Sequence, residues 1–241
     1  MTDLNSISNI DNELRRLPWK LRILTFESLF KAGSGHIGPC LSMAEILTCL
    51  FFRSMKLEKG NLSNDKFILS KGHGVPILYS VFAELGWIDK SELGTLRQVD
   101  SRLQGHPDRT SLEFLDSGSG ALGQGISIAI GYALAQQMQS QDNNSYCIVG
   151  DGEMQEGQIW EAILFAGVKK IKNLCVIVDN NKFQNEKSVE ETLGEIHLEK
   201  KVKAFGWHYI SIDGHSIEEI LNAIETFKIN DAPTLIDAHT I

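Results

Sequence analysis

The chain has 241 residues, of which 42% are hydrophobic and 22% charged, and its formal net charge at pH 7 is -8. This length is enough for one sizeable hydrophobic core. The acidic balance argues against a nucleic-acid partner, which would need a basic surface. No segment reaches the roughly 20 uncharged apolar residues of a membrane span. Residues 1–17 lack the basic and apolar regions of a secretory signal. We therefore expect a cytoplasmic protein that binds neither nucleic acid nor membrane.

The cysteines favour the same compartment. Cys40, Cys49, Cys147 and Cys175 are scattered through apolar runs and form no C-x-x-C pair. We expect them to be buried thiols in a reducing compartment, and not disulfides or zinc ligands.

The first third of the chain is predicted to form helices around one strand. Apolar residues recur at helical spacing over residues 13–32. A second helix is expected over Leu41–Met55, with Ser42 as N-cap and Glu45 three residues later, which is a capping-box pattern. The next elements are a short strand and a helix, at Lys66–Ser70 and Val75–Leu85.

Short apolar runs rich in β-branched residues alternate with helical segments in the rest of the chain. Such uninterrupted runs are typical of strands buried on both faces of a parallel sheet. The predicted strands are Tyr146–Val149, Leu174–Val178, His208–Ile212 and Thr234–Ala238. The predicted helices are Gly120–Met138, Gln158–Val168 and Ser216–Phe227. This order predicts an α/β fold: one domain over residues 1–241, with a doubly wound, mostly parallel sheet and helices on both faces.

The strongest chemical signal is a pair of motifs at two predicted strand ends. Gly150-Asp151-Gly152 follows one strand, and Asn180-Asn181 follows the next. Ligands of open parallel sheets bind beyond the carboxyl ends of the strands. Asp151 and Asn181 offer a carboxylate and an amide oxygen, which suit Mg²⁺ together with a main-chain carbonyl and phosphate oxygens. Either motif alone is ordinary turn chemistry, but the two together predict a site for a metal and a diphosphate.

Three histidines in predicted loops, His36, His73 and His106, each follow a glycine. His106 lies in the irregular stretch 86–119, which is long for a plain connection and therefore favours a functional loop. Imidazoles that titrate near neutrality can remove a proton from a hydroxyl and stabilise a developing alkoxide. The remaining histidines are interpreted as surface or structural, although the last of them ends a strand and could approach the site; they are His197, His208, His215 and His239.

The sequence around the metal motif, GDGEMQEGQIWEAILFAG followed by NLCVIVDNNKF, resembles the thiamine diphosphate motif of transketolase. Further segments resemble other parts of that family in the same order: AGSGHIGPCLSMAEIL, FILSKGHGVPILYSVFAELG, SRLQGHPD and SGALGQGISIAIGYALA. The resemblance runs from about Leu14 to the end of the chain. It implies a thiamine diphosphate-binding fold and an enzyme that moves a two-carbon ketol unit between sugars or sugar phosphates. The implied metal is Mg²⁺, which Ca²⁺ or Mn²⁺ could replace.

Roles for individual residues also follow from the resemblance. It implies that the side chains of Asp151 and Asn181 and the carbonyl of Phe183 bind the metal. It implies that His36 and His106 contact substrate hydroxyls, and that His73 contacts the cofactor and the reacting oxygen, so that all three are catalytic. The residues implied to contact the cofactor are His73, Gly120, Ala121, Leu122, Gly150, Gly152, Glu156 and Asn181, of which Glu156 is read as structural or as communicating between sites.

The length suits only the first of the three domains of a long transketolase. The resemblance therefore implies the N-terminal subunit of a split transketolase. Its C-terminal partner subunit would bind the pyrimidine and supply the catalytic glutamate. We expect the chain alone to be inactive and to self-associate, or to join its partner in a heterotetramer. An exposed apolar face around Leu122, Ile126 and Ile130 is expected to form an interface.

Alternatives remain open at this stage. The chain could be a subunit of another two-component thiamine diphosphate enzyme of the 2-oxo acid dehydrogenase type. It could also be a non-catalytic scaffold that binds the cofactor. The sequence stops in the last predicted strand, so a truncation after Ile241 is a further alternative.

Overall fold

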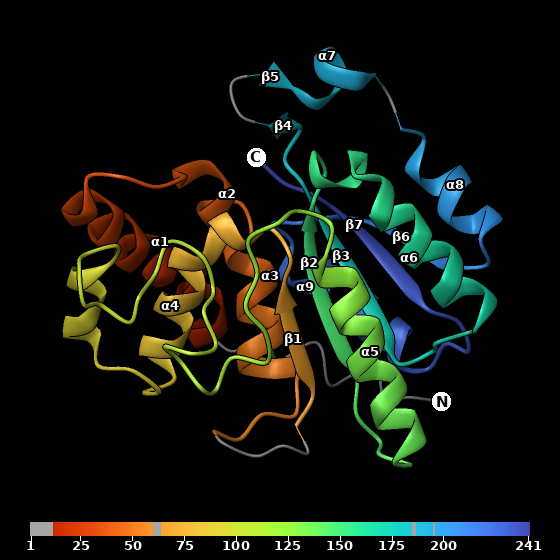
Figure 1. Cartoon of the computed structure of the whole chain (residues 1–241), viewed down its shortest axis with the longest axis horizontal. Helices are drawn as coiled ribbons and strands as arrows, with labels where there is room; N and C mark the ends of the chain where they lie inside the picture. The colour runs from red at the N-terminus through yellow and green to blue at the C-terminus, as the bar shows by residue number, and fades with distance from the viewer. Residues whose placement is uncertain (1–11, 60–63, 185–186, 195) are drawn as a thin grey trace.

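The computed structural model describes residues 12–59, 64–184, 187–194 and 196–241. Residues 1–11, which form most of the segment that lacks the features of a secretory signal, lie outside these ranges. The described residues form a five-stranded parallel sheet with the order β1-β2-β3-β7-β6 (Figure 1). Its strands are β1 Lys66–Leu69, β2 Ser145–Gly150, β3 Leu174–Asn180, β7 Thr234–His239 and β6 His208–Asp213. The predicted parallel α/β sheet is confirmed.

Helices cover both faces of this sheet, because the central strands are apolar on both sides. In β2, Tyr146 and Ile148 belong to one core, while Cys147 and Val149 belong to the other. The first core is closed by α1 Asn12–Ala32, α2 Ile37–Leu41, α3 Ala44–Cys49, α4 Val75–Glu84 and α9 Ile217–Lys228. The second core is closed by α5 Gly125–Met138, α6 Gly157–Val168 and α8 Leu198–Ala204.

Short elements fill the connections of the described chain. They are the π-helical turn η2 Leu50–Ser54, the 3₁₀ turns η3 Gly72–Gly74, η4 Lys90–Thr95 and η5 Glu153–Gln155, and the helix α7 Val189–Leu193. A two-stranded antiparallel ribbon, β4 Phe183–Gln184 with β5 Lys187–Ser188, follows β3.

The helix predicted over Leu41–Met55 starts later, at Ala44, and runs on from α3 into the π-helical η2, whereas the N-cap role predicted for Ser42 is wrong. The segment divides into α2, α3 and η2, and Ser42 caps the C-terminus of α2 through its N–H, which donates to the Gly38 carbonyl. The Ser42 hydroxyl donates instead to Asp179 Oδ2 at 2.6 Å, on the distant strand β3. Glu45 is engaged by Arg22 at 2.6 Å and 2.7 Å. A long-range polar contact has therefore replaced the local capping box.

The apolar interface expected around Leu122, Ile126 and Ile130 is also wrong in its position. Residues 120–124 form a loop, and α5 begins only at Gly125. Ile126 and Ile130 are buried, with exposures of 0% and 5%, because that side of α5 packs on the sheet. Gly125 permits this approach, since a Cβ there would lie 2.5 Å from the Ser70 side chain.

Ile37–Ser54 is the one described helical stretch with the length and apolar character of a membrane span, and 67% of it is buried inside the molecule. Such burial is typical of a core segment. All four cysteines are buried and free, as predicted.

Candidate active site

The loops that follow β1, β2 and β3 meet at the carboxyl edge of the sheet. Gly150 of β2 pairs with Asp179 of β3, so the two motifs singled out from the sequence lie on neighbouring strands. The N–H of Asp151 donates to the Asp179 carbonyl at 3.2 Å, which joins the two strand ends directly. This edge is the expected place for a ligand in an open parallel sheet.

The three glycine-flanked histidines gather beside this edge. His36 precedes α2, His73 lies in η3 after β1, and the two rings are 5.3 Å apart between centroids in an edge-to-face arrangement. His106 lies against Gly72, because a Cβ on Gly72 would approach the His106 ring to 3.2 Å. His36 and His106 are exposed, whereas His73 is half-buried. Two imidazoles are thus open to an incoming molecule above a third that is partly enclosed.

Two of these imidazoles are held in the neutral form. Burial lowers the pKa of His73 from 6.5 to about 4, and the nearby Lys71 ammonium adds to this effect. Burial also lowers the pKa of His106, and the Arg97 guanidinium adds to it. Neutral imidazoles at pH 7 can accept a proton and return it.

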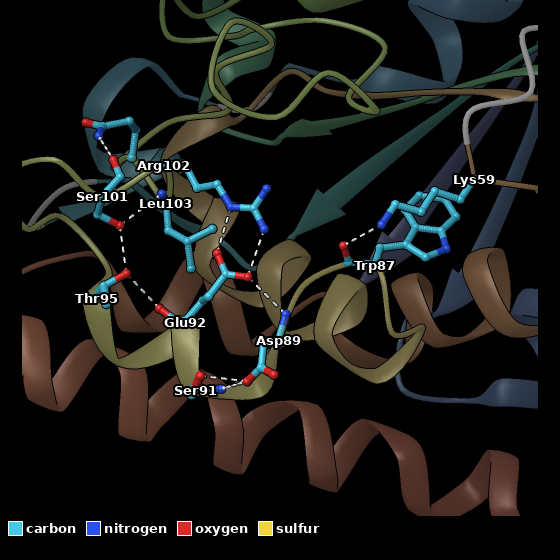
Figure 2. A network of polar contacts seen from close by, with 10 residues as sticks. Lys59, Trp87, Asp89, Ser91, Glu92, Thr95, Ser101, Arg102 and Leu103 are labelled. Carbon is cyan, nitrogen blue, oxygen red and sulfur yellow. Dashed lines mark hydrogen bonds and ion pairs between the residues drawn. The ribbon is translucent and has the colours of Figure 1, made fainter.

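The segment that carries His106 is ordered by the polar network in Figure 2, although it contains little regular structure. Asp89 and Glu92 form a capping box at η4. Arg102 then donates to both carboxylate oxygens of Glu92, at 2.7 Å and 2.8 Å, and Thr95 hydrogen-bonds Ser101 at 2.8 Å. The irregular stretch is therefore tied into a fixed loop.

Arg97, in the same stretch, lies between two of the histidine loops. A Cβ on Gly105 would be 2.7 Å from Arg97 Nε, and a Cβ on Gly35 would be 3.7 Å from Nη1. Nη1 also lies 3.4 Å from the Ser34 hydroxyl. No motif in the sequence marks Arg97, since its neighbours come from distant segments. Its guanidinium adjoins both loops that carry the exposed histidines.

The predicted metal ligands lie close together after β2 and β3. Asp151 Oδ1 accepts from the Gly152 N–H at 2.9 Å, and Oδ2 accepts from the Lys182 N–H at 2.6 Å. Asn181 Oδ1 accepts from the Phe183 N–H at 3.0 Å. Burial raises the pKa of Asp151 to about 6. The Phe183 side chain is 68% exposed and carries no oxygen, so only its main-chain carbonyl could bind a metal.

The oxygen atoms of Asp151 and Asn181 could bind a hard cation, but they do not make a complete coordination shell. Within the described residues there is no cluster of three or more His, Cys, Asp or Glu side chains that could hold a metal. A metal at Asp151 would therefore need amide, carbonyl or ligand oxygens to complete its shell. Such a mixed oxygen set, completed by phosphate oxygens, is typical of Mg²⁺.

The glycine segment before α5 faces the same edge. Gly120 and Ala121 are exposed, and the Leu122 carbonyl accepts from Gln158 Nε2 at 2.7 Å. Gly123 has a φ of 84°, which favours glycine, and a Cβ there would lie 3.0 Å from the Glu156 Cβ. Glu156 is therefore placed beside the segment, and its side chain is exposed.

Glu153, three residues before Glu156, is the buried carboxylate that joins these loops. It accepts from the Gly123 N–H at 2.6 Å and the Gly150 N–H at 3.1 Å, and also from the Ser70 hydroxyl. It is 3% exposed, and its burial raises its pKa. The only hint of it in the sequence is its place directly after Gly150-Asp151-Gly152.

A buried ion pair lies beneath the histidines. Lys71, which precedes the Gly72-His73 turn, is paired with Asp179 of β3, and both side chains are almost fully buried. Asp179 also accepts from the hydroxyls of Ser42 and Thr240. Three segments of the chain are therefore fixed to one carboxylate of β3.

Other features of this edge bear on a bound group. Ser119 Oγ is buried and has no hydrogen-bond partner among the described residues. A Cβ on Gly152 would approach the Gln184 side chain to 2.6 Å, so only a flexible side chain covers this glycine. The orphaned hydroxyl fits a phosphate-bearing cofactor, because it offers a donor to the phosphate oxygens.

The remaining histidines have separate environments. His215 contacts Glu45 at 3.0 Å, and His239 contacts the Ser211 hydroxyl at 3.0 Å. A cavity of about 770 Å³ is lined by both Asp151 and His239. His239 therefore borders the edge that carries the predicted metal ligands, whereas His215 contacts α3 through Glu45.

Comparison with known proteins accords with this geometry. Residues 15–241 match the family model described as transketolase, thiamine diphosphate binding domain. The chain is 43% identical over 225 residues to the 6-deoxy-6-sulfo-D-fructose transketolase subunit SqwG of Clostridium sp. (strain MSTE9), which covers 92% of this chain and 82% of that protein. It is 42% identical over 226 residues to the transketolase of Mus musculus, which covers 92% of this chain and 36% of that protein.

Solved structures give the same fold. A transketolase from Campylobacter jejuni superposes with a TM-score of 0.87 at 35% identity, covering 94% of this chain and 37% of that one. A transketolase variant from Pichia stipitis superposes with a TM-score of 0.90 at 29% identity, covering 95% and 36%. The chain thus spans most of one curated relative but about a third of the longer ones.

Proposed function

This chain belongs to the transketolase family, in its thiamine diphosphate-binding domain, and from that premise we propose that it is the N-terminal subunit of a two-component transketolase. With a separate C-terminal subunit it transfers a two-carbon ketol unit from a ketose or ketose phosphate to an aldose or aldose phosphate. The convergence of His36, His73 and His106 beside the Asp151 edge carries this proposal. The 82% coverage of the SqwG subunit, against 36% of a long transketolase, supports the split organisation.

Thiamine diphosphate and Mg²⁺ are the proposed cofactors. Asp151, Asn181 and the Phe183 carbonyl would hold the metal, and Gly150, Gly152 and the 120–122 segment would contact the diphosphate side. When bound, the cofactor supplies an electron sink for the two-carbon unit. The orphaned Ser119 hydroxyl supports the fit, and so does Gly152, which only the flexible Gln184 side chain covers.

The proposed chemistry of this chain is proton transfer at sugar hydroxyls. A neutral imidazole accepts the proton of a donor-sugar hydroxyl as the adjacent carbon–carbon bond breaks. It returns a proton to the aldehyde oxygen of the acceptor, which becomes a hydroxyl as the new carbon–carbon bond forms. The exposed rings of His36 and His106 are available for this task. His73, half-buried and neutral, donates or accepts a hydrogen bond nearer to the sheet edge.

The proposed assembly is a heterotetramer in the cytoplasm, working in carbohydrate metabolism. The C-terminal subunit is proposed to hold the pyrimidine and supply the carboxylate that activates the cofactor. A subunit of the 2-oxo acid dehydrogenase type gains no support, because the relatives compared above are transketolases. A cofactor-binding scaffold without catalysis is the outcome that the experiment below must exclude.

The test is reconstitution. The purified chain is mixed with the companion C-terminal subunit, thiamine diphosphate and Mg²⁺, and ketol transfer is followed from a ketose phosphate and from 6-deoxy-6-sulfofructose in parallel. We expect turnover that requires both subunits and both cofactors. Turnover by this chain alone would contradict the split enzyme. Cofactor binding by the pair without turnover on either donor would favour the scaffold.

A further inference from the structure

Helix α1 has two apolar faces, and only one of them is used inside the chain. Leu14, Leu21 and Leu29 are buried against the first core. Polar groups on the same side are satisfied there, since Thr25 bonds Ser80 at 2.9 Å and Ser28 donates to the Leu93 carbonyl at 2.6 Å. The solvent-facing side of an ordinary surface helix is polar, whereas that of α1 includes a row of large apolar residues.

The outer side of α1 carries four large exposed apolar residues at helical spacing, which we call the α1 stripe: Trp19, Ile23, Phe26 and Phe30. Their exposed fractions are 67%, 59%, 51% and 79%. The Phe26 and Phe30 rings stack with centroids 6.4 Å apart, and the Arg22 guanidinium lies 5.2 Å from the Trp19 ring. Residues at i, i+4, i+7 and i+11 lie on one narrow face of a helix. Continuous apolar patches rich in aromatic residues are typical of protein–protein interfaces.

The α1 stripe leads toward the candidate active site. The helix ends at Ala32, packs against α2, and is followed by the loop that carries His36. Ile37, the first residue of α2 and the neighbour of His36, is itself 46% exposed. An occupant that covers the α1 stripe and extends past Ile37 would therefore reach the exposed histidines.

The charges beside the α1 stripe help to decide whether a second copy of this chain or a different chain covers it. Along its edge lie three basic residues and one acidic residue, all exposed: Arg16, Lys20, Lys31 and Glu27. Lys20 is paired with Glu84, but Glu84 is also paired with Lys90, so the edge stays net basic. In a symmetric contact between two copies, the same surface meets itself, so a net basic edge would face a net basic edge. A different chain with an acidic edge has no such penalty.

The length of the relatives indicates which different chain could cover the α1 stripe. The longer transketolases contain about two thirds of a polypeptide that this chain does not match, since the matched part is 36% of their length. We infer that the α1 stripe is the docking surface for the C-terminal transketolase subunit, which meets it through an apolar patch with an acidic rim. This inference rests on the proposed function, because it names the partner of the same site.

The test uses the wild-type pair and two triple variants. Ile23→Gln/Phe26→Gln/Phe30→Gln replaces three of the four residues of the α1 stripe with glutamine, which favours helix. The matched control, Met138→Gln/Val168→Gln/Ile229→Gln, removes three residues that are 86%, 69% and 76% exposed elsewhere. Binding of each to the immobilised C-terminal subunit is measured by surface plasmon resonance. Circular dichroism melts report whether each variant is folded.

We expect the α1 stripe variant to bind the C-terminal subunit at least about tenfold more weakly than wild type, and the control to bind like wild type. Hydroxyl-radical footprinting of the wild-type pair gives a second readout that needs no variant: oxidation of Trp19, Phe26 and Phe30 should fall on complex formation. Unchanged binding together with an unchanged footprint would overturn the inference while leaving the proposed function intact. So would a loss confined to self-association, which would identify a second copy as the occupant. A wild-type pair that forms no complex would overturn both.

Discussion

Lys71 and Asp179 form a buried ion pair that ties the turn after β1 to the end of β3. Asp179 completes its hydrogen bonding with the hydroxyls of Ser42 and Thr240, which come from segments far apart in the sequence. Lys71 directly precedes the Gly72-His73 turn, and Asp179 lies two residues before Asn181. One carboxylate therefore positions both the histidine side and the metal side of the candidate site.

Breaking this pair should destabilise the fold. Lys71→Met leaves Asp179 buried without its cation, and loss of one partner of a buried ion pair costs about 3–5 kcal/mol. Lys71→Met/Asp179→Asn removes both charges and should cost less than Lys71→Met alone. Urea unfolding of the three proteins gives the comparison. Lys56→Met, which breaks the exposed pair with Asp142, should leave the unfolding free energy unchanged. A Lys71→Met variant as stable as the Lys56→Met control would show that the pair is not structural.

The lowered pKa of His73 predicts a pH dependence of stability with a definite sign. The pKa is 6.5 for an unperturbed histidine and about 4 in the folded chain. Between these values the unfolded chain binds the extra proton, so acidification favours unfolding. Relative to His73→Gln, the wild type should lose on the order of 1–2 kcal/mol as the pH falls from 7 to 4, a value reduced for the partial exposure of the ring. Urea unfolding of both proteins across this range measures the difference, and parallel curves would contradict the assignment.

The sheet could be predicted from the sequence because its central strands are apolar on both faces. The runs at Tyr146–Val149 and Leu174–Val178 have no polar alternation to place them at a surface, and each strand is buried throughout. The adjacency of the two motifs followed from the same reasoning, since Gly150 and Asn180 end neighbouring parallel strands. Local pattern and topology agree here, so a sequence alone is sufficient.

What the sequence does not disclose depends on contacts between distant segments. Ser42 has a local capping box available, but its hydroxyl bonds Asp179, 137 residues away. Arg97 adjoins Gly35 and Gly105 only in the folded chain. The α1 stripe could not be predicted, because α1 is apolar on two sides and periodicity alone does not say which side faces the core.

The metal site gives a prediction about cofactor affinity. Asp151→Ala removes the anionic oxygen that the Gly152 and Lys182 N–H groups now orient. Loss of residues that merely support metal ligands costs 10–100-fold in affinity, so loss of the ligand itself should cost on the order of 100-fold or more. Calorimetric titration of thiamine diphosphate into the two-subunit protein, with and without Mg²⁺, provides the measurement.

The matched control for that experiment is Asp142→Ala. Asp142 is an exposed carboxylate that precedes β2, at the opposite edge of the sheet from Asp151. Its replacement should leave the affinity unchanged. If Asp151→Ala binds the cofactor as tightly as Asp142→Ala, the carboxylate is no metal ligand, and its contacts with Gly152 and Lys182 only stabilise the loop.

His106 offers the sharpest test of catalysis, because its removal should disturb little else. The ring is exposed, and the loop that carries it is held by the Glu92–Arg102 pair rather than by the imidazole. In the reconstituted enzyme, His106→Ala should lower kcat about 10²- to 10⁴-fold, the usual cost of losing a positioned acid or base. His208→Ala, at the start of β6 and so at the edge of the sheet opposite the candidate site, should retain wild-type turnover. Equal melting temperatures would show that both variants are folded. A His106→Ala enzyme that keeps its kcat and changes only KM would limit this imidazole to binding the sugar hydroxyl, and leave the proton transfer to His36 or His73.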